Sequence, residues 1–406
     1  MSRVFFAILL CLGLAGPLMA QNFSGLARLD VDRSGISATE DGGFAIDLRL
    51  SQGVPYRLFT LTDPLRLVLD FQEVDWTGLE KSDLLVDGWV TQANFGTYVP
   101  GWSRLVLTLD APANISQAGV TVDDVTGAAW LSVHLTPSDE DAFAAAAGAP
   151  YDPRWDLPPT SVRNPRQSKG ADQPKMVVLD PGHGGIDPGA EAGDINEKLL
   201  MLTFARELRE VLLRSGGFDV ELTRDGDYFV SLERRIEIAH QAGADVFISL
   251  HADSLAEGLA HGATVYVLSE EASDIASAKL AERHDRDDLL AGVDLSRADD
   301  EVTDVLLDLA RQETRPRTQA LAGALVNAIA QTGGPMNRRP LRAASFSVLK
   351  AADIPSVLVE IGFLSSPRDL ENLKNPEWRA SMAEGIRNGL ANWREADDAQ
   401  RPLVRH

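Results

Sequence analysis

The chain has 406 residues and a mass of 43.9 kDa, which exceeds one typical domain and fits two or three. Its 60 acidic and 38 basic side chains give a formal net charge of -22. This charge argues against nucleic acid as a partner and against a polybasic membrane-surface binder, since both need clustered basic groups. After the N-terminus there is no run of about 18 apolar residues, so we predict no internal transmembrane span.

The first twenty residues have the pattern of a secretory signal peptide. Arg3 precedes an apolar run, Gly16 and Pro17 break it, and Ala20 offers a small residue for cleavage. An uncleaved anchor helix is the alternative, but the run is short for a span. Cys11 is the single cysteine and lies within this segment. We therefore predict an exported chain, cleaved at about Ala20, whose domains fold without disulfides.

Residues 25–136 have the pattern of an all-β domain. Short runs alternate apolar and polar residues between Gly, Pro and Asp, which is the signal of half-buried strands. The clearest runs are residues 44–50, 66–71, 103–109 and 129–135. His134 falls on the last of these, far from other metal-ligating residue types, so we interpret it as an ordinary strand residue.

The composition changes after Thr136. Residues 137–174 combine an acidic patch, an alanine run and seven prolines. Such a segment is typical of an extended linker.

From Met176 onward, apolar runs alternate with segments of helical period. The predicted strands are residues 176–179, 220–223, 246–250, 264–268 and 356–359, and the predicted helices are 197–214, 232–242, 319–330 and 378–393. This alternation is typical of a mostly parallel sheet with helices on both faces. We expect this α/β domain to cover residues 175–396, followed by a tail at 397–406.

Ionisable side chains follow three of the predicted strands. His183 lies in a glycine-rich turn after the first strand, and His251 and Glu360 come directly after two others. Ligands of open α/β sheets bind beyond the carboxyl ends of the strands, so these groups should converge. Glu197 adds a second carboxylate at the start of a helix.

Two imidazoles and a carboxylate with one open position are typical of a catalytic zinc site. His240 and His261 compete as ligands. However, His240 falls on a predicted helix and His261 precedes a strand, which favours surface or packing roles. For each histidine taken singly, a structural role is the alternative to metal binding. The placement of these residues together at strand ends favours the metal site.

Four ordered motifs now match a known family. Residues 178–185, 196–198, 248–254 and 359–364 closely resemble the zinc-dependent N-acetylmuramoyl-L-alanine amidases of bacterial cell division. This resemblance extends from about Met176 to Trp393. The β-rich segment from about Leu26 to Leu135 is similar to the AMIN domain, which targets peptidoglycan in such proteins.

The resemblance implies a role for each candidate residue. His183, Glu197 and His251 would be zinc ligands, and Glu360 would be the catalytic carboxylate. The implied reaction is hydrolysis, in the periplasm, of the amide between N-acetylmuramic acid and L-alanine of the peptidoglycan stem, for daughter-cell separation. The alternatives are an inactive, wall-binding relative and a zinc peptidase acting within stem peptides.

Residues from about 270 to 312 form an insert that a minimal α/β domain does not need. A solvated helical hairpin is one interpretation. The resemblance implies another, an autoinhibitory element that a LytM-type activator displaces. In relatives an acidic side chain of this insert caps the zinc, whereas the corresponding place here holds His284, with Glu282 and Asp285 beside it.

Overall fold

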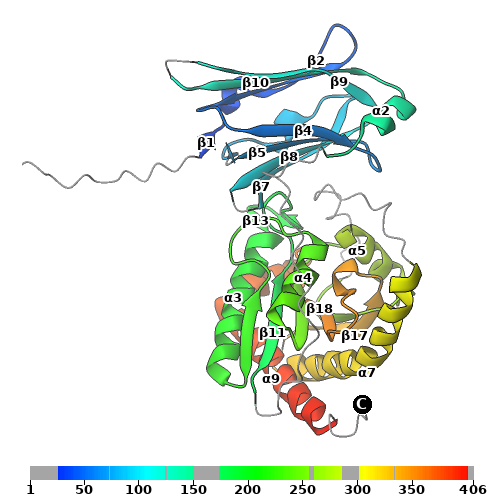
Figure 1. The fold of residues 1–406 in the computed structure, drawn as a ribbon. Coiled ribbons are helices and arrows are strands. Elements are labelled where there is room, and N and C mark those ends of the chain that lie inside the picture. The colour runs from blue at the N-terminus through cyan, green and yellow to red at the C-terminus, as the bar shows by residue number, and fades with distance from the viewer. Residues whose placement is uncertain are drawn as a thin grey trace, which may run out of the picture.

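The structure is a computed structural model that describes residues 26–400 apart from 73, 100, 124–125, 150–172, 256–259, 286–300 and 333. An all-β part lies at one end of the molecule and an α/β part at the other (Figure 1). The predicted signal peptide lies outside the described residues, as do most of the predicted linker and residues 286–300 of the insert. Among the described residues, no helix combines the length and apolarity needed to cross a membrane.

The N-terminal part is a sandwich of two antiparallel four-stranded sheets, which confirms the all-β prediction. One sheet has the order β2-β3-β10-β9 and the other the order β4-β5-β8-β7, while β1 and β6 form a short parallel pair. The strand bounds are β1 Ala27–Arg28, β2 Gly35–Ala38, β3 Phe44–Leu50, β4 Tyr56–Leu61, β5 Arg66–Gln72, β6 Val74–Asp75, β7 Val90–Val99, β8 Trp102–Leu109, β9 Ala113–Val122 and β10 Ala129–Pro137. Two 3-10 helices, Val31–Arg33 and Lys81–Leu84, accompany them.

The core of the sandwich follows from the period-two pattern. Alternate residues of each inner strand point between the sheets and are buried, as with Phe44, Ile46 and Leu48 of β3. A short helix that the sequence did not predict, α2 (Glu140–Ala146), follows β10 and buries Phe143 in the same core. The segment predicted as a linker therefore begins with a helix packed on the sandwich.

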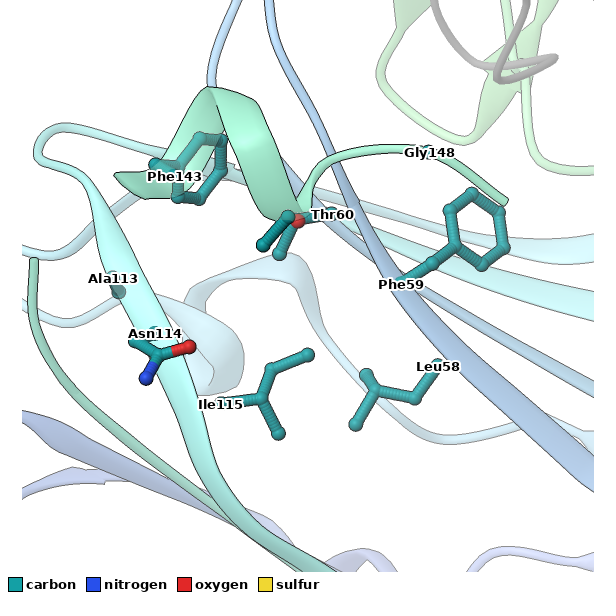
Figure 2. A pocket seen from close by; sticks show the side chains of 9 residues that line it. Leu58, Phe59, Thr60, Ala113, Asn114, Ile115, Phe143 and Gly148 are labelled. Carbon is teal, nitrogen blue, oxygen red and sulfur yellow. The ribbon is translucent and has the colours of Figure 1, made fainter. Parts of the chain in front are cut away.

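A small pocket lies where α2 meets the edge strands β4 and β9 (Figure 2). Its volume is about 260 Å³, and it carries no ionisable side chain. The lining residues are Leu58, Phe59, Thr60, Ala113, Asn114, Ile115, Phe143, Ala146 and Gly148. With mostly apolar side chains, one hydroxyl and one amide, the lining has no ionisable group for acid–base chemistry.

The C-terminal part is built on a six-stranded sheet of order β14-β11-β15-β18-β16-β17. The strands are β11 Lys175–Pro181, β14 Phe218–Leu222, β15 Val246–His251, β16 Ala263–Leu268, β17 Met336–Ala344 and β18 Ser356–Glu360, and a small hairpin joins β12 Glu191–Ala192 to β13 Ile195–Asn196. All neighbouring strands of the large sheet pair in parallel except β16 and β18, which are antiparallel. The predicted α/β class with a mostly parallel sheet is confirmed.

Helices cover both faces of this sheet. Val177 and Leu179 of β11 face a core shared with α3 (Glu197–Ser215), α7 (Glu301–Gln331) and α9 (Pro376–Gln400). Val178 faces the opposite core, shared with α4 (Leu232–Ala242), α5 (Ile275–Asp285) and the 3-10 helix Ser347–Leu349. The short helix α8 (Pro367–Lys374) follows β18. Because both faces of the sheet are buried, its central strands are continuous apolar runs in the sequence.

Two helices extend well beyond the sequence expectation. Helix α7 starts at Glu301, well before the predicted residue 319, and contains Pro316. Helix α9 continues to Gln400, so residues 397–400 of the expected tail are helical. The added part of α7 has apolar residues at helical spacing (Val302, Val305, Leu306 and Leu309), which indicates a helix, and the structure joins this part to the predicted helix. The added residues of α9 are mostly polar and carry no apolar period of their own.

Candidate active site

His183 lies in the loop that leaves β11, in an unusual backbone conformation. Its φ of 60° is in the left-handed region, which a non-glycine residue adopts rarely and at an energetic cost. Glycines on either side are required by close approach: a Cβ at Gly182 would lie 2.2 Å from the His251 ring, and one at Gly189 would lie 2.5 Å from the His183 ring. The loop therefore folds tightly around two imidazoles.

Glu197 is the first residue of α3 and is fully buried. Asn196 caps the helix by accepting a hydrogen bond from the Leu199 N–H. The Glu197 carboxylate accepts hydrogen bonds from the backbone N–H groups of Ala190 (2.9 Å) and Ala252 (2.8 Å). These two bonds fix the carboxylate between the loop after β11 and the end of β15.

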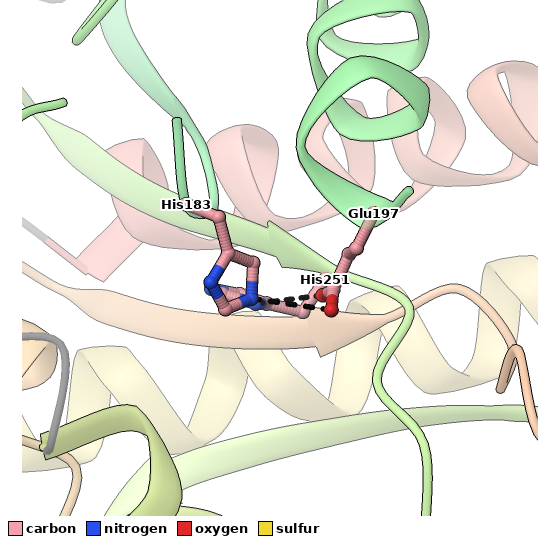
Figure 3. Close-up of side chains that lie close together, drawn as sticks. All are labelled: His183, Glu197 and His251. Carbon is pink, nitrogen blue, oxygen red and sulfur yellow. Dashed lines mark hydrogen bonds and ion pairs between the residues drawn. The ribbon is translucent and has the colours of Figure 1, made fainter. Parts of the chain in front are cut away.

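The structure brings His183, Glu197 and His251 together (Figure 3). His183 Nε2 lies 3.2 Å from Glu197 Oε2, and His251 Nδ1 lies 3.0 Å from Glu197 Oε1. One ligand atom from each of the three lies within 4.8 Å of the others. Donors about 2.0–2.2 Å from a tetrahedral ion are about 3.3–3.6 Å apart, so these residues fit a single metal ion.

His251 and Glu197 are held in the states that metal ligands need. Burial, reinforced by nearby His284, lowers the pKa of His251 to about 4, so its ring is neutral at pH 7. Burial opposes ionisation of Glu197, but the two histidines beside it hold its pKa well below the usual range. Neutral imidazole and ionised carboxylate are the donor forms that bind metal.

Asp187 was not recognised from the sequence as a functional residue. Its Oδ2 lies 2.6 Å from His183 Nδ1, and its Oδ1 accepts a hydrogen bond from the Gly189 N–H. Burial raises the pKa of this carboxyl, yet His183 and the other hydrogen bonds outweigh it and lower the pKa to about 2. A carboxylate on the second ring nitrogen fixes the tautomer of a ligating histidine. Only its position four residues after His183 in the same loop could have suggested this role.

Glu360 ends β18 beside His251, its partner in the strand register. Its Oε2 accepts a hydrogen bond from the Asp253 N–H at 3.0 Å. Complete burial, together with nearby Glu197 and Asp253, raises its pKa well above the usual range. A carboxyl with a raised pKa at the end of a central strand is the kind of group that exchanges protons near neutral pH.

His284 reaches this site from the last turn of α5. Its ring centroid lies 4.2 Å from that of His251 and 5.9 Å from that of His183, and the residue is 3% exposed. The Glu282 side chain is instead exposed. Asp285 ends α5, and its side chain lies outside the described residues. Of the expected insert residues whose side chains are described, His284 is therefore the one that lies at the site.

The other histidines that the structure describes lie apart from this cluster. His134 is exposed on β10, and His240 on α4 contacts Asp353 at 2.8 Å on the surface. His261 is also exposed, just before β16. Neither His240 nor His261 belongs to a group of metal-ligating residues among the described positions.

The all-β part touches the loop that carries His183. The Phe229 N–H donates a hydrogen bond to the Thr97 carbonyl of β7 at 3.3 Å, and the Tyr98 ring stacks on Phe229 with centroids 5.8 Å apart. A Cβ at Gly185 would lie 1.7 Å from the same Thr97 oxygen. This contact joins segments far apart in the sequence, and no local pattern predicts it.

The family described as N-acetylmuramoyl-L-alanine amidase matches residues 177–392, which include all four predicted site residues. The chain belongs to this amidase family. A match to the AMIN domain covers residues 36–133 of the sandwich. The family resemblance drawn from the sequence motifs is confirmed, and with it the enzyme class, N-acetylmuramoyl-L-alanine amidase.

Relatives of this amidase cover one or both parts of the chain. The N-acetylmuramoyl-L-alanine amidase AmiA of Salmonella typhimurium is 38% identical over 229 residues, covering 56% of this chain and 78% of that protein. AmiC of Neisseria meningitidis serogroup B is 29% identical over 364 residues, covering 86% of both. Among solved structures, the amidase AmiC2 of Nostoc punctiforme is 28% identical with a TM-score of 0.41, covering 56% of this chain and 99% of that one.

Proposed function

We propose that this amidase is a zinc enzyme, exported to the periplasm, that splits septal peptidoglycan during daughter-cell separation. The proposed ligands are His183, Glu197 and His251, with Glu360 as the catalytic carboxylate. The observation that carries the proposal is the buried cluster of two imidazoles and one carboxylate, fixed by backbone hydrogen bonds at the carboxyl ends of the strands. When bound, zinc would polarise the scissile carbonyl, acidify a water molecule and favour the ionised form of Glu360.

The chain's own residues supply the proton transfers and the orientation. Glu360 takes the proton of the attacking water and passes it to the leaving amine of L-alanine. The Asp253 N–H holds Glu360 by one oxygen and leaves the other directed at the site. Asp187 holds the His183 ring in one tautomer. Each of these groups is buried, so bulk water competes little for their hydrogen bonds.

We also propose that the insert holds the enzyme at a low basal rate until a LytM-type activator displaces it. Support comes from His284, which α5 carries to within 4.2 Å of the His251 ring, measured between ring centroids. His284 also packs edge-on against Phe346, with centroids 5.4 Å apart. A side chain in this position occupies space that a substrate carbonyl needs near the proposed ligands.

Digestion of purified peptidoglycan tests the zinc chemistry. The wild-type protein with zinc should release stem peptides that begin with L-alanine, identified by mass spectrometry. Chelation and His183→Ala should abolish release, and Glu360→Gln should lower kcat about 10²- to 10⁴-fold while the ion held by His183, Glu197 and His251 stays bound. Full activity after removal of all zinc would refute the proposal. Cleavage only within stem peptides would instead favour the peptidase alternative.

The inhibitory role of the insert has a separate test. His284→Ala should raise basal amidase activity without activator, because it removes the side chain that α5 places over the site. His134→Ala changes an exposed histidine of the sandwich and serves as the matched control, with no change expected. Equal basal rates for wild type and His284→Ala would remove His284 as the inhibitory residue.

A further inference from the structure

Three buried side-chain nitrogen or oxygen atoms beside the proposed zinc ligands make no hydrogen bond within the described residues. They are Asp253 Oδ2, His284 Nε2 and Glu360 Oε1. Their residues are 2%, 3% and 0% exposed. Leaving a buried polar atom unpaired is costly, and native structures contain few such atoms. Three together on converging side chains indicate a ligand that satisfies all of them.

The distances between these atoms suit a metal ion. His284 Nε2 lies 3.4 Å from Asp253 Oδ2 and 3.9 Å from Glu360 Oε1, and the three donors lie within 4.8 Å of one another. Such separations are close to those between neighbouring donors around a tetrahedral ion, about 3.3–3.6 Å. They are long for a hydrogen bond between an imidazole and a carboxylate.

The donors are also separate from the first cluster and held in place by other contacts. Asp253 Oδ1 accepts a hydrogen bond from Arg283 at 2.5 Å, which leaves Oδ2 directed at His284. Glu360 Oε2 is fixed by the Asp253 N–H, which leaves Oε1. Two carboxylates at close range also repel in a buried site, and a cation between them removes that repulsion.

We propose that Asp253, His284 and Glu360 form a second divalent-cation site, of the zinc class, that exists only while α5 is docked. One imidazole nitrogen and two carboxylate oxygens are ligands that zinc accepts. Asp253 and Glu360 come from the sheet, whereas His284 comes from the insert, so the ion links the insert to the sheet.

This inference rests on the proposed function and specifies how the insert inhibits. An ion on Glu360 occupies the carboxylate that would otherwise accept a proton from water. The same ion holds α5 down through His284. Zinc in excess of the first site would therefore inhibit, and removal of α5 by an activator would dismantle the second site.

Zinc stoichiometry of the full chain tests the proposal without reference to activity. Metal-free protein is equilibrated with buffered free zinc, and bound metal is measured by inductively coupled plasma mass spectrometry. We expect two ions per chain for wild type and for the control His134→Ala, and one for His284→Ala and for His183→Ala. His284→Glu replaces the imidazole with another zinc donor and should keep two. Circular dichroism confirms that each variant is folded.

The outcomes separate this site from the proposed function. A wild type that binds one ion, lost in His183→Ala but kept in His284→Ala, would overturn the second site and leave the zinc amidase intact. Two ions in both wild type and His284→Ala would place the second ion elsewhere and also overturn the proposal. No bound ion in any variant would overturn both. Where the site exists, excess zinc should lower the wild-type amidase rate about tenfold and leave the rate of His284→Ala unchanged.

Discussion

At the scale of single residues, the site depends on how rigidly the loop after β11 holds the imidazole of His183. His183 is held in a left-handed conformation, where Gly189 leaves room for its ring and Gly182 leaves room for that of His251. Its Nδ1 atom is 2.6 Å from Asp187. Because the backbone strain and the ring orientation are both maintained by neighbours, a change in those neighbours should alter metal binding before it alters the fold.

We therefore predict that Asp187→Asn weakens zinc binding about 10- to 100-fold. The amide keeps the size of the side chain but removes the negative charge that orients His183. Competition with a chromophoric chelator measures the affinity. Asp194→Asn, an exposed change in the turn between β12 and β13, is the matched control. Equal affinities for both variants would show that the 2.6 Å contact has no role in binding.

The sequence predicted the main residues of the site better than their surroundings. His183, His251 and Glu360 follow strands whose apolar runs are easily recognised, and parallel strand ends meet at one edge, so their convergence could be predicted. The roles of Asp187 and Asp253 could not, because an aspartate in a loop has the same local pattern whether it orients a ligand or faces solvent.

At the scale of elements, one buried carboxylate joins four segments around the site. Asp180 of β11 accepts hydrogen bonds from Arg235 of α4, Ser249 of β15 and Thr223 just after β14, each at 2.6 Å. Arg235 also donates to the His183 carbonyl at 2.9 Å. Burial opposes the charge, but Arg235 and the two hydroxyls lower the pKa of Asp180. The ionised aspartate therefore links α4, β11, β15 and the segment after β14, and through Arg235 it also links them to the loop that carries His183.

Asp180→Asn should destabilise the α/β part by about 3–5 kcal/mol, because Arg235 is left buried without its counter-charge. A depressed folded-state pKa contributes stability that is complete above the ordinary aspartate value, about 3.9, and is lost as the pH falls through the folded value. The gap between wild type and Asp180→Asn should therefore be widest near neutral pH and shrink below about pH 4. Urea unfolding across this range measures it. Exposed Asp219→Asn on β14 is the control, and a gap that grows on acidification would contradict the argument.

Elements with a clear apolar period were predicted well, and those without one were not. Helix α4 was predicted with the bounds that the structure shows, and strand β3 likewise. Strand β17 was missed, since Met336–Ala344 carries three arginines and a proline and lies at the edge of the sheet. Edge strands with many charged residues lack the alternation of apolar and polar residues that marks a half-buried strand.

At the scale of the whole molecule, strand β7 of the sandwich supports the loop after β11, which carries His183. Tyr98 lies between two supports: its ring stacks on Phe229, and the Arg104 guanidinium lies 3.6 Å from the ring centroid on the sandwich side. Arg104 is itself paired with buried Asp70 at 2.5 Å. A surface pair, Lys81 and Glu191 at 3.2 Å, adds a weaker link, because exposed ion pairs contribute little.

Tyr98→Ala should loosen this contact and speed amide exchange at Phe229, whose N–H donates to the Thr97 carbonyl across the junction. An aromatic pair contributes about 0.5–1.5 kcal/mol beyond its buried area, which corresponds to about 2- to 10-fold faster exchange. Hydrogen–deuterium exchange of the peptide containing Phe229 measures the effect in the full chain. Trp130→Ala removes an aromatic from the other sheet, where Trp130 is 40% exposed, and should leave that peptide unchanged. If Phe229 is equally protected in wild type and Tyr98→Ala, the sandwich does not brace the loop after β11 in solution. That loop would then keep its conformation through contacts within the α/β part, such as those of Arg235 and Asp187.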